Sequence, residues 1–158
     1  DHYPQLPTWQ EAGVEFTLLI GSWKDKQAPT LHFSPIVALD IFATEATQLT
    51  LRLDPRFEYG LMPLEGRFDI DDESFDNNNL AYLGMLRESI TLDLHQGARL
   101  LLIGGAPLAD SVSIWWNFVG HSKEDIASAQ ADWEAKSPRF ATVPGYNGKR
   151  LMPPPIPW

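Results

Sequence analysis

The sequence predicts an all-β sandwich or barrel, followed by one α-helix and an extended tail. Apolar and polar residues alternate along four segments, which is typical of strands with one buried face. The four segments are residues 14–20, 48–54, 90–95 and 111–118. Further apolar stretches cover residues 36–43, 57–68 and 100–103, and turn clusters at 71–74 and 96–97 lie between strands. Short strands at this spacing favour a sandwich or barrel over a sheet of βαβ units.

The fourth alternating segment contains two adjacent tryptophans. In a strand, Trp115 and Trp116 must face opposite sides. Trp116 joins the apolar stripe of the segment and is expected in the core. Trp115 lies with the polar residues of the segment. There it can pack under the helix, for example against Trp133, or serve as a sugar-binding platform. Packing is favoured because a buried tryptophan removes much apolar area from water.

A helix is predicted over residues 122–136. Ser122 can cap its start, and Asp125 follows three residues later, close to a capping box. Apolar residues three and four positions apart share one helical face. They are Ile126, Ala129 and Trp133. We expect this face to cover the outside of the sheet.

We interpret residues 1–158 as a single domain, with the barrel over about 12–120 and the tail over 138–158. The tail is rich in proline and glycine, which favours an extended conformation. It also carries several apolar side chains. We therefore expect it to pack on its own barrel or on a neighbouring molecule.

Composition excludes several classes of protein. The chain has 12 basic and 21 acidic side chains, and its net charge of −9 argues against direct binding to nucleic acid or to an anionic membrane. It contains no cysteine, which excludes disulfides, thiolate metal sites and a cysteine nucleophile. No apolar run reaches the roughly 18 residues of a transmembrane helix, and no signal peptide is visible. These features favour a cytoplasmic protein.

Isolated chemical signals along the chain are weak. The acidic cluster at residues 69–76 fails as a calcium loop, because Ser74 and Leu80 stand where glycine and glutamate are needed. We interpret it as a solvated hairpin loop. The four histidines are far apart in sequence, and no serine nucleophile motif or phosphate-binding glycine loop is present.

The last third of the chain is specific. It contains G-G-A-P-L from Gly104, W-N-F-V from Trp116, a helical E-D-I-A-S-A segment from Glu124, and R-F-A-T-V-P-G from Arg139. This combination strongly resembles the C-terminal domain of bacterial pirin-like proteins. The chain departs from the commoner G-G-E-P-L-G-E-P form at Ala106, Ala109, Asp110 and Ser111.

The resemblance implies a cupin-type β-barrel (a double-stranded β-helix, or jelly roll). It also implies a bicupin in the full-length family, with an iron site of three histidines and a glutamate in the N-terminal barrel. The activities it implies are metal-dependent quercetin 2,3-dioxygenation and redox-sensitive binding to transcription regulators. A chain beginning at Asp1 then fits an expressed domain, a proteolytic fragment, or a gene reduced to one barrel.

We expect no metal site and no cofactor in this chain. Glu58 lies near the position of the cupin glutamate, but no histidine precedes it, and Arg87 stands where the later histidine would be. Arginine cannot ligate a metal. Glu58 and Arg87 are instead expected to face each other inside the barrel as an ion pair, and Glu58, Tyr59, Arg87 and His95 are the candidate ligand-binding residues of the interior.

Three functions follow from these observations. The first is a structural and interaction half of a bicupin, whose partners are the N-terminal barrel and a regulatory protein. The second is an independent dioxygenase or isomerase, which requires two of His32, His95 and His121 to converge with Glu58 or Glu65. The third is a barrel that binds a carbohydrate or an aromatic acid, which requires an open mouth lined by aromatic and polar groups.

Overall fold

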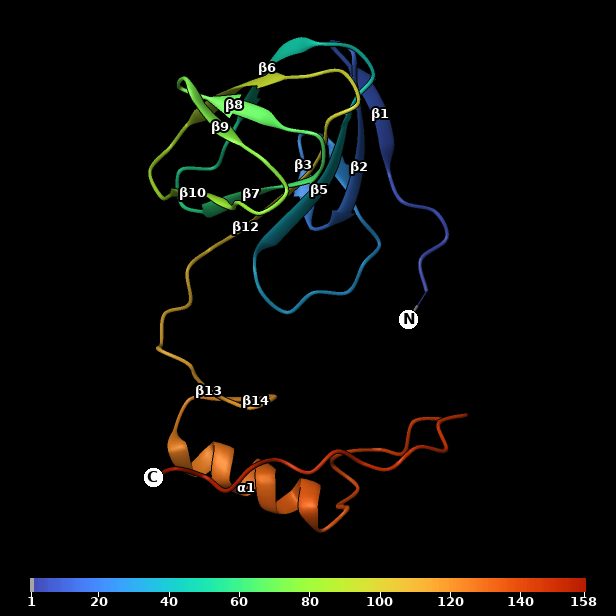
Figure 1. Ribbon diagram of the computed structural model, residues 1–158, viewed down its shortest axis with the longest axis vertical. Helices are drawn as coiled ribbons and strands as arrows, with labels where there is room; N and C mark the ends of the chain where they lie inside the picture. Colours follow the sequence, from blue (N-terminus) through green and yellow to red (C-terminus); the bar gives the residue numbers. More distant parts are fainter. Residues whose placement is uncertain (1) are drawn as a thin grey trace. The chain divides into compact units, whose positions relative to one another are not determined.

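The computed structural model describes residues 2–158, which form two compact units with a boundary between Pro107 and Leu108 (Figure 1). We call residues up to Pro107 the barrel unit and Leu108–Trp158 the C-terminal unit. The barrel strands end at Gly105, so the barrel is shorter than the expected range of 12–120. Within the described part of the chain, no helix is long and apolar enough to cross a membrane.

The larger sheet of the barrel unit has six antiparallel strands in the order β1-β2-β5-β12-β7-β10. Its strands are β1 (Thr8–Glu11), β2 (Val14–Ile20), β5 (Ile36–Ala43), β12 (Arg99–Gly105), β7 (Glu58–Glu65) and β10 (Ala81–Gly84). Strands distant in sequence therefore pair in space, as in a jelly roll. The predicted alternating segment 14–20 and the apolar stretch 36–43 coincide with β2 and β5.

The smaller sheet has four antiparallel strands in the order β6-β11-β8-β9. These are β6 (Thr47–Arg52), β11 (Ser89–Leu94), β8 (Phe68–Ile70) and β9 (Glu73–Phe75). The predicted acidic hairpin joins β8 to β9 through Asp71 and Asp72, both with positive φ. Two consecutive residues of positive φ are the requirement of a type I′ turn. A separate short hairpin pairs β3 (Ser22–Trp23) with β4 (Lys26–Gln27).

The inner faces of the two main sheets form one apolar core. Buried and half-buried residues alternate strictly along β5, where Leu39 and Ile41 are fully buried. The smaller sheet contributes the alternating residues Ile90, Leu92 and Leu94 of β11. Each fully buried Leu or Ile side chain stabilises the fold by about 1.5–3 kcal/mol relative to exposure. The period-two prediction is thus confirmed for these strands.

The C-terminal unit corrects one predicted strand. Residues 111–118 form no single strand; β13 (Ser113–Trp115) and β14 (Phe118–Gly120) make a hairpin instead. Trp116 has a φ of 52° and starts the turn, which breaks the alternation. Trp116, rather than Trp115, contacts Trp133, with ring centroids 5.9 Å apart.

The helix α1 (Lys123–Glu134) begins as predicted, with Ser122 and Asp125 forming a full capping box. Its buried residues Ile126 and Ala129 pack with Phe118 of the hairpin. The expected helical face is therefore confirmed, but its partner within this unit is the hairpin. Trp115 donates a hydrogen bond from its Nε1 to Gln130, 3.2 Å away.

The tail runs back along the helix of its own unit. Trp133 Nε1 donates to the carbonyl oxygen of Leu151 at 2.8 Å, and Arg150 lies over the Trp133 ring, 4.2 Å from its centroid. Trp158 contacts Trp115 edge-on, with ring centroids 5.7 Å apart. These contacts hold the tail against α1 of the same chain.

Candidate functional site

The barrel unit contains a cavity of about 860 Å³. Volumes of this size are typical of small-molecule sites. Three parts of the chain far apart in sequence line it: residues 21–24, residues 32–37, and the residues Arg52, Asp54, Phe57 and Tyr59. Four aromatic side chains contribute to the walls. They are Trp23, Phe33, Phe57 and Tyr59.

Gly21 shapes the entrance between β2 and β3. Its φ is +79°, a left-handed conformation that side chains rarely adopt, and a Cβ at this position would lie 1.8 Å from the carbonyl oxygen of Ile36. The sharp turn at Gly21 places Ser22, Trp23 and Lys24 along one wall. Only glycine fits this position without moving the start of β5.

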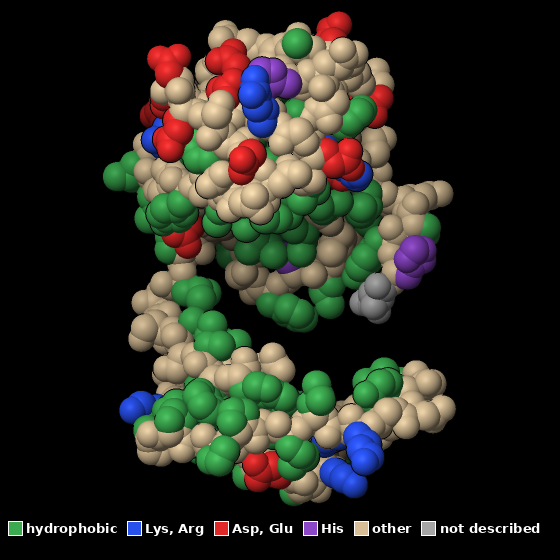
Figure 2. All heavy atoms as spheres, viewed as in Figure 1, with side chains coloured by type: hydrophobic (Ala, Val, Ile, Leu, Met, Phe, Trp, Pro, Cys, Tyr) green, Lys and Arg blue, Asp and Glu red, His purple; other side chains and the backbone are tan. Residues whose placement is uncertain are grey.

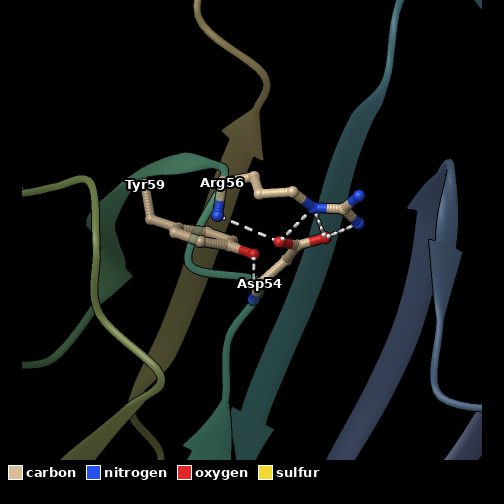
Figure 3. Close-up of polar contacts among 3 residues, drawn as sticks. All are labelled: Asp54, Arg56 and Tyr59. Carbon is tan, nitrogen blue, oxygen red and sulfur yellow. Dashed lines mark hydrogen bonds and ion pairs between the residues drawn. The ribbon is translucent and has the colours of Figure 1, made fainter.

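Tyr59 forms the most deeply buried part of the wall, with 2% of its surface exposed. Its ring lies over Gly104 of β12, where a Cβ would approach Tyr59 Cδ1 to 2.3 Å. The hydroxyl accepts a hydrogen bond of 2.9 Å from the backbone N–H of Asp54 (Figure 3). Burial raises the pKa of the Tyr59 hydroxyl, so it stays protonated at neutral pH.

The loop between β6 and β7 holds a tight ion pair. Arg56 donates to the Asp54 carboxylate from Nε at 2.9 Å and from Nη2 at 2.6 Å, and its backbone N–H adds a third bond of 3.0 Å (Figure 3). These hydrogen bonds favour the ionised form and lower the pKa of Asp54 to about 2. The negative charge of Asp54 is therefore compensated by Arg56, which lies outside the cavity lining.

The basic groups at the cavity differ in their partners. Lys24 forms an ion pair with Glu11. The Nδ1 atom of His32 lies 3.0 Å from the carbonyl oxygen of Thr30. Arg52 lies at the end of β6 and is exposed, and its side chain makes no ion pair or hydrogen bond with any of residues 2–158.

The residues predicted from the sequence do not form one site. Of the four candidate ligand-binding residues, only Tyr59 lines the cavity, together with the candidate histidine His32. Glu58 accepts a hydrogen bond of 2.7 Å from the Tyr82 hydroxyl. Arg87 is exposed and donates from Nε to the carbonyl oxygen of Leu83 at 3.1 Å, so its expected place inside the barrel is wrong. His95 is half-buried at the end of β11, with Nε2 3.1 Å from Asp69 Oδ2.

The expected ion pair between Glu58 and Arg87 does not form, because each side chain has a different partner. The convergence required for an independent metal enzyme is also not found. Within residues 2–158, no three His, Cys, Asp or Glu side chains come together in a group able to hold a metal ion. His32 and His95 lie on different segments with separate partners.

Sequence reasoning missed most of the cavity lining. The sequence pattern places Arg52 only among the polar residues of the alternating segment 48–54. It places Phe57 only in the apolar stretch 57–68. The one available signal was the D-P-R-F segment 54–57, whose Asp-Pro start is typical of a turn. That signal places a loop next to Tyr59 but does not show what the loop faces.

Two facing antiparallel sheets with jelly-roll pairing and a cavity in the barrel define a cupin-type barrel. A sequence profile of the pirin C-terminal cupin domain matches residues 38–140. The match covers well over half of the chain and includes the G-G-A-P-L, W-N-F-V and helical motifs that carry the resemblance. The chain belongs to the pirin family and corresponds to its C-terminal cupin domain.

Known relatives agree with this assignment. A Pseudomonas aeruginosa protein provisionally named a quercetin 2,3-dioxygenase is 51% identical over the whole chain, which covers 50% of that protein. A pirin-like protein from Caulobacter vibrioides is 25% identical over 83% of the chain and 44% of its own length. A crystal structure of quercetin 2,3-dioxygenase from Acinetobacter baumannii matches with a TM-score of 0.93 and 35% identity, over 99% of this chain and 52% of that one.

The chain thus spans about half the length of the relatives it matches. Their names refer to proteins about twice as long.

Proposed function

We propose that this chain is the interaction half of a two-barrel pirin, that it carries no metal of its own, and that its main partner is the N-terminal cupin barrel. One observation carries the proposal: the P. aeruginosa relative is 51% identical over the whole chain but has twice its length. Iron chemistry of the quercetin 2,3-dioxygenase type then belongs to the other half. A regulatory protein partner and a cytoplasmic location complete the proposal.

An apolar patch on the outer face of the larger sheet supports a docking role. We call it the outer patch; its members are Met62, Leu80, Tyr82 and Ile103, which are 37%, 54%, 66% and 45% exposed. Leu80 and Ile103 both lie over Gly60, since a Cβ there would be 3.2 Å from one and 3.7 Å from the other. Hydrophobic side chains form a visible band on the barrel unit (Figure 2). Contiguous exposed apolar surface of this kind marks interaction sites.

The C-terminal unit supports the same role. Its core contains only three buried apolar residues: Phe118, Ile126 and Ala129. Ile114 and Val119 are opposite each other in the hairpin register and are 68% and 65% exposed, so one face of the hairpin is apolar and uncovered. A unit this small buries little apolar surface by itself. Covering the hairpin face with a partner would stabilise it.

The experiment mixes the full chain with the separately purified N-terminal half of the P. aeruginosa relative. Size-exclusion chromatography with light scattering should show a one-to-one complex. Ile103→Lys should abolish it, because a charge would be buried in the contact. Thr91→Lys adds the same charge on the exposed face of the smaller sheet and should leave binding intact. Failure of the unmodified chain to bind, or equal loss in both variants, would contradict the docking surface.

The metal part of the proposal is tested by native mass spectrometry of the purified chain, before and after addition of ferrous iron. A bare chain mass in both spectra is the expected result. Stoichiometric iron would contradict it, and His95, His32 and Glu58 would then be substituted in turn.

A further inference from the structure

We propose that the barrel cavity binds a planar aromatic carboxylate, with Arg52 as the residue that recognises the carboxylate group. This inference goes beyond the proposed function, because it concerns a site inside the barrel unit and needs no partner barrel.

The apolar part of the cavity suits a flat ring. Phe57 and Tyr59 lie with ring centroids 6.1 Å apart, and Trp23 belongs to the same lining. Phe33 belongs to the same lining but is 94% exposed. A phenyl ring left almost entirely in water at a cavity edge favours a ligand that covers it. Offset or edge-on packing of aromatic rings would orient such a ligand.

The charged part of the cavity favours an anion. Among the described residues, Asp54 is the only acidic member of the lining, and Arg56 binds its carboxylate. Lys24 is likewise compensated by Glu11. The guanidinium of Arg52 is left without a partner among the described residues, on a chain whose net charge is −9. Arginine binds carboxylates through two parallel hydrogen bonds, which gives it geometric specificity for this group.

One further donor can assist. The Tyr59 hydroxyl accepts from Asp54 N–H, and its own proton has no acceptor in the part of the chain that the structure describes. A neutral sugar would need matched donors and acceptors around its hydroxyls. An unpaired cation beside aromatic walls fits an aromatic acid better.

The test uses the full chain and two probes that differ only in charge, 2-naphthoate and 2-naphthamide, measured by isothermal titration calorimetry. We expect 2-naphthoate to bind with a dissociation constant of about 1 mM or tighter. Arg52→Gln should weaken binding of 2-naphthoate about tenfold, as expected for one charge-assisted interaction, and should not affect 2-naphthamide. Arg87→Gln is the matched control, since Arg87 is also exposed but lies outside the cavity, and it should bind both probes normally.

A second pair of variants tests the aromatic wall. Phe33→Ser should weaken the binding of both probes by about fivefold, because the contact with the lost ring does not depend on the charge of the probe. Leu31→Ser is its control on the same loop; Leu31 is 61% exposed and lies outside this cavity. All four substituted side chains are exposed, so each variant should fold, and a thermal melt checks this.

Absence of heat with 2-naphthoate up to about 5 mM would overturn the proposal. Equal binding of the two probes, or unchanged affinity in Arg52→Gln, would also overturn it, because the carboxylate would then not be recognised. None of these outcomes affects the partner-barrel experiment, which tests Ile103 of the outer patch against Thr91 of the smaller sheet. The two proposals can therefore fail separately.

Discussion

Replacing Tyr59 by phenylalanine should destabilise the barrel unit through a single lost hydrogen bond. The side chain is 2% exposed, and its hydroxyl accepts the backbone N–H of Asp54 at 2.9 Å. The substitution keeps the ring, so the packing against Gly104 is preserved. What changes is that the Asp54 N–H, in a half-buried loop, loses its acceptor.

The magnitude follows from the cost of an unsatisfied donor. Removing one partner of a hydrogen bond in a protected site costs about 1–3 kcal/mol. The N–H of Asp54 lies in a half-buried loop, so we expect about 1–2 kcal/mol of lost unfolding free energy. With a urea m-value of about 2 kcal/mol/M, the unfolding midpoint should fall by roughly 0.5–1 M at an unchanged m-value.

The control is another tyrosine of the same unit. Tyr82 is 66% exposed, and its hydroxyl donates to Glu58 at 2.7 Å. Because water can replace that bond, Tyr82→Phe should change the unfolding free energy by less than about 0.5 kcal/mol. Urea unfolding followed by circular dichroism measures both variants. Equal effects of the two substitutions, or a change below about 0.5 kcal/mol for Tyr59→Phe, would refute the role assigned to the buried hydroxyl.

Three other predictions concern the loop, the cavity entrance and the helix. Arg56→Gln should raise the pKa of Asp54 from about 2 toward its ordinary value of 3.8, which a carboxyl-detected NMR titration measures. The pKa of Asp54 is lower in the folded state than in the unfolded state, so this ion pair stabilises the fold fully above about pH 4. That contribution is lost as the pH falls toward 2. Arg56→Gln should therefore lose less unfolding free energy over that interval than the unmodified chain. Gly21→Ala should cost roughly 3 kcal/mol or more, since the new Cβ would lie 1.8 Å from the Ile36 oxygen at a φ of +79°, and a normal melting temperature would contradict this. Ser122→Ala should cost about 1 kcal/mol of helix stability, because it removes the N-cap. Amide hydrogen exchange in the first turn of α1 should become faster, and an unchanged exchange rate would show that the cap contributes nothing.

The barrel strands were predictable because burial alternates with a period of two. Leu49 and Leu51 of β6, for example, are each 4% exposed, while Thr50 between them is exposed. One local pattern fixes both the strand and its buried face. The start of α1 was predictable for a similar reason, since the capping box uses residues only three positions apart.

The hairpin in the C-terminal unit shows where the same rule fails. The stretch from residue 111 to 118 alternates in sequence as well as any barrel strand does. The chain nevertheless reverses at Trp116, whose positive φ is uncommon for a large side chain. Asn117, a typical turn residue, was the signal against a continuous strand. Packing of Trp116 against Trp133 and Phe118 accompanies the reversal, and contacts of that kind cannot be inferred from periodicity.

Two arginines of the barrel unit, Arg52 and Arg87, show why the cavity could not be predicted. Arg87 stands where the cupin pattern places the later histidine, so the sequence predicts it inside the barrel. Its side chain is instead exposed and donates to the carbonyl oxygen of Leu83. Arg52 looked like an ordinary polar residue of β6, but it is the last residue of that strand and lines the cavity. Alternation assigns faces only within a strand, and a side chain at a strand end can turn toward whatever segment lies next to it. Here the cavity is also lined by Trp23 and Phe33, which come from two other segments of the chain. A binding residue at a strand end is therefore recognised only once the strand order is known, and Arg52 is the residue on which the carboxylate experiment depends.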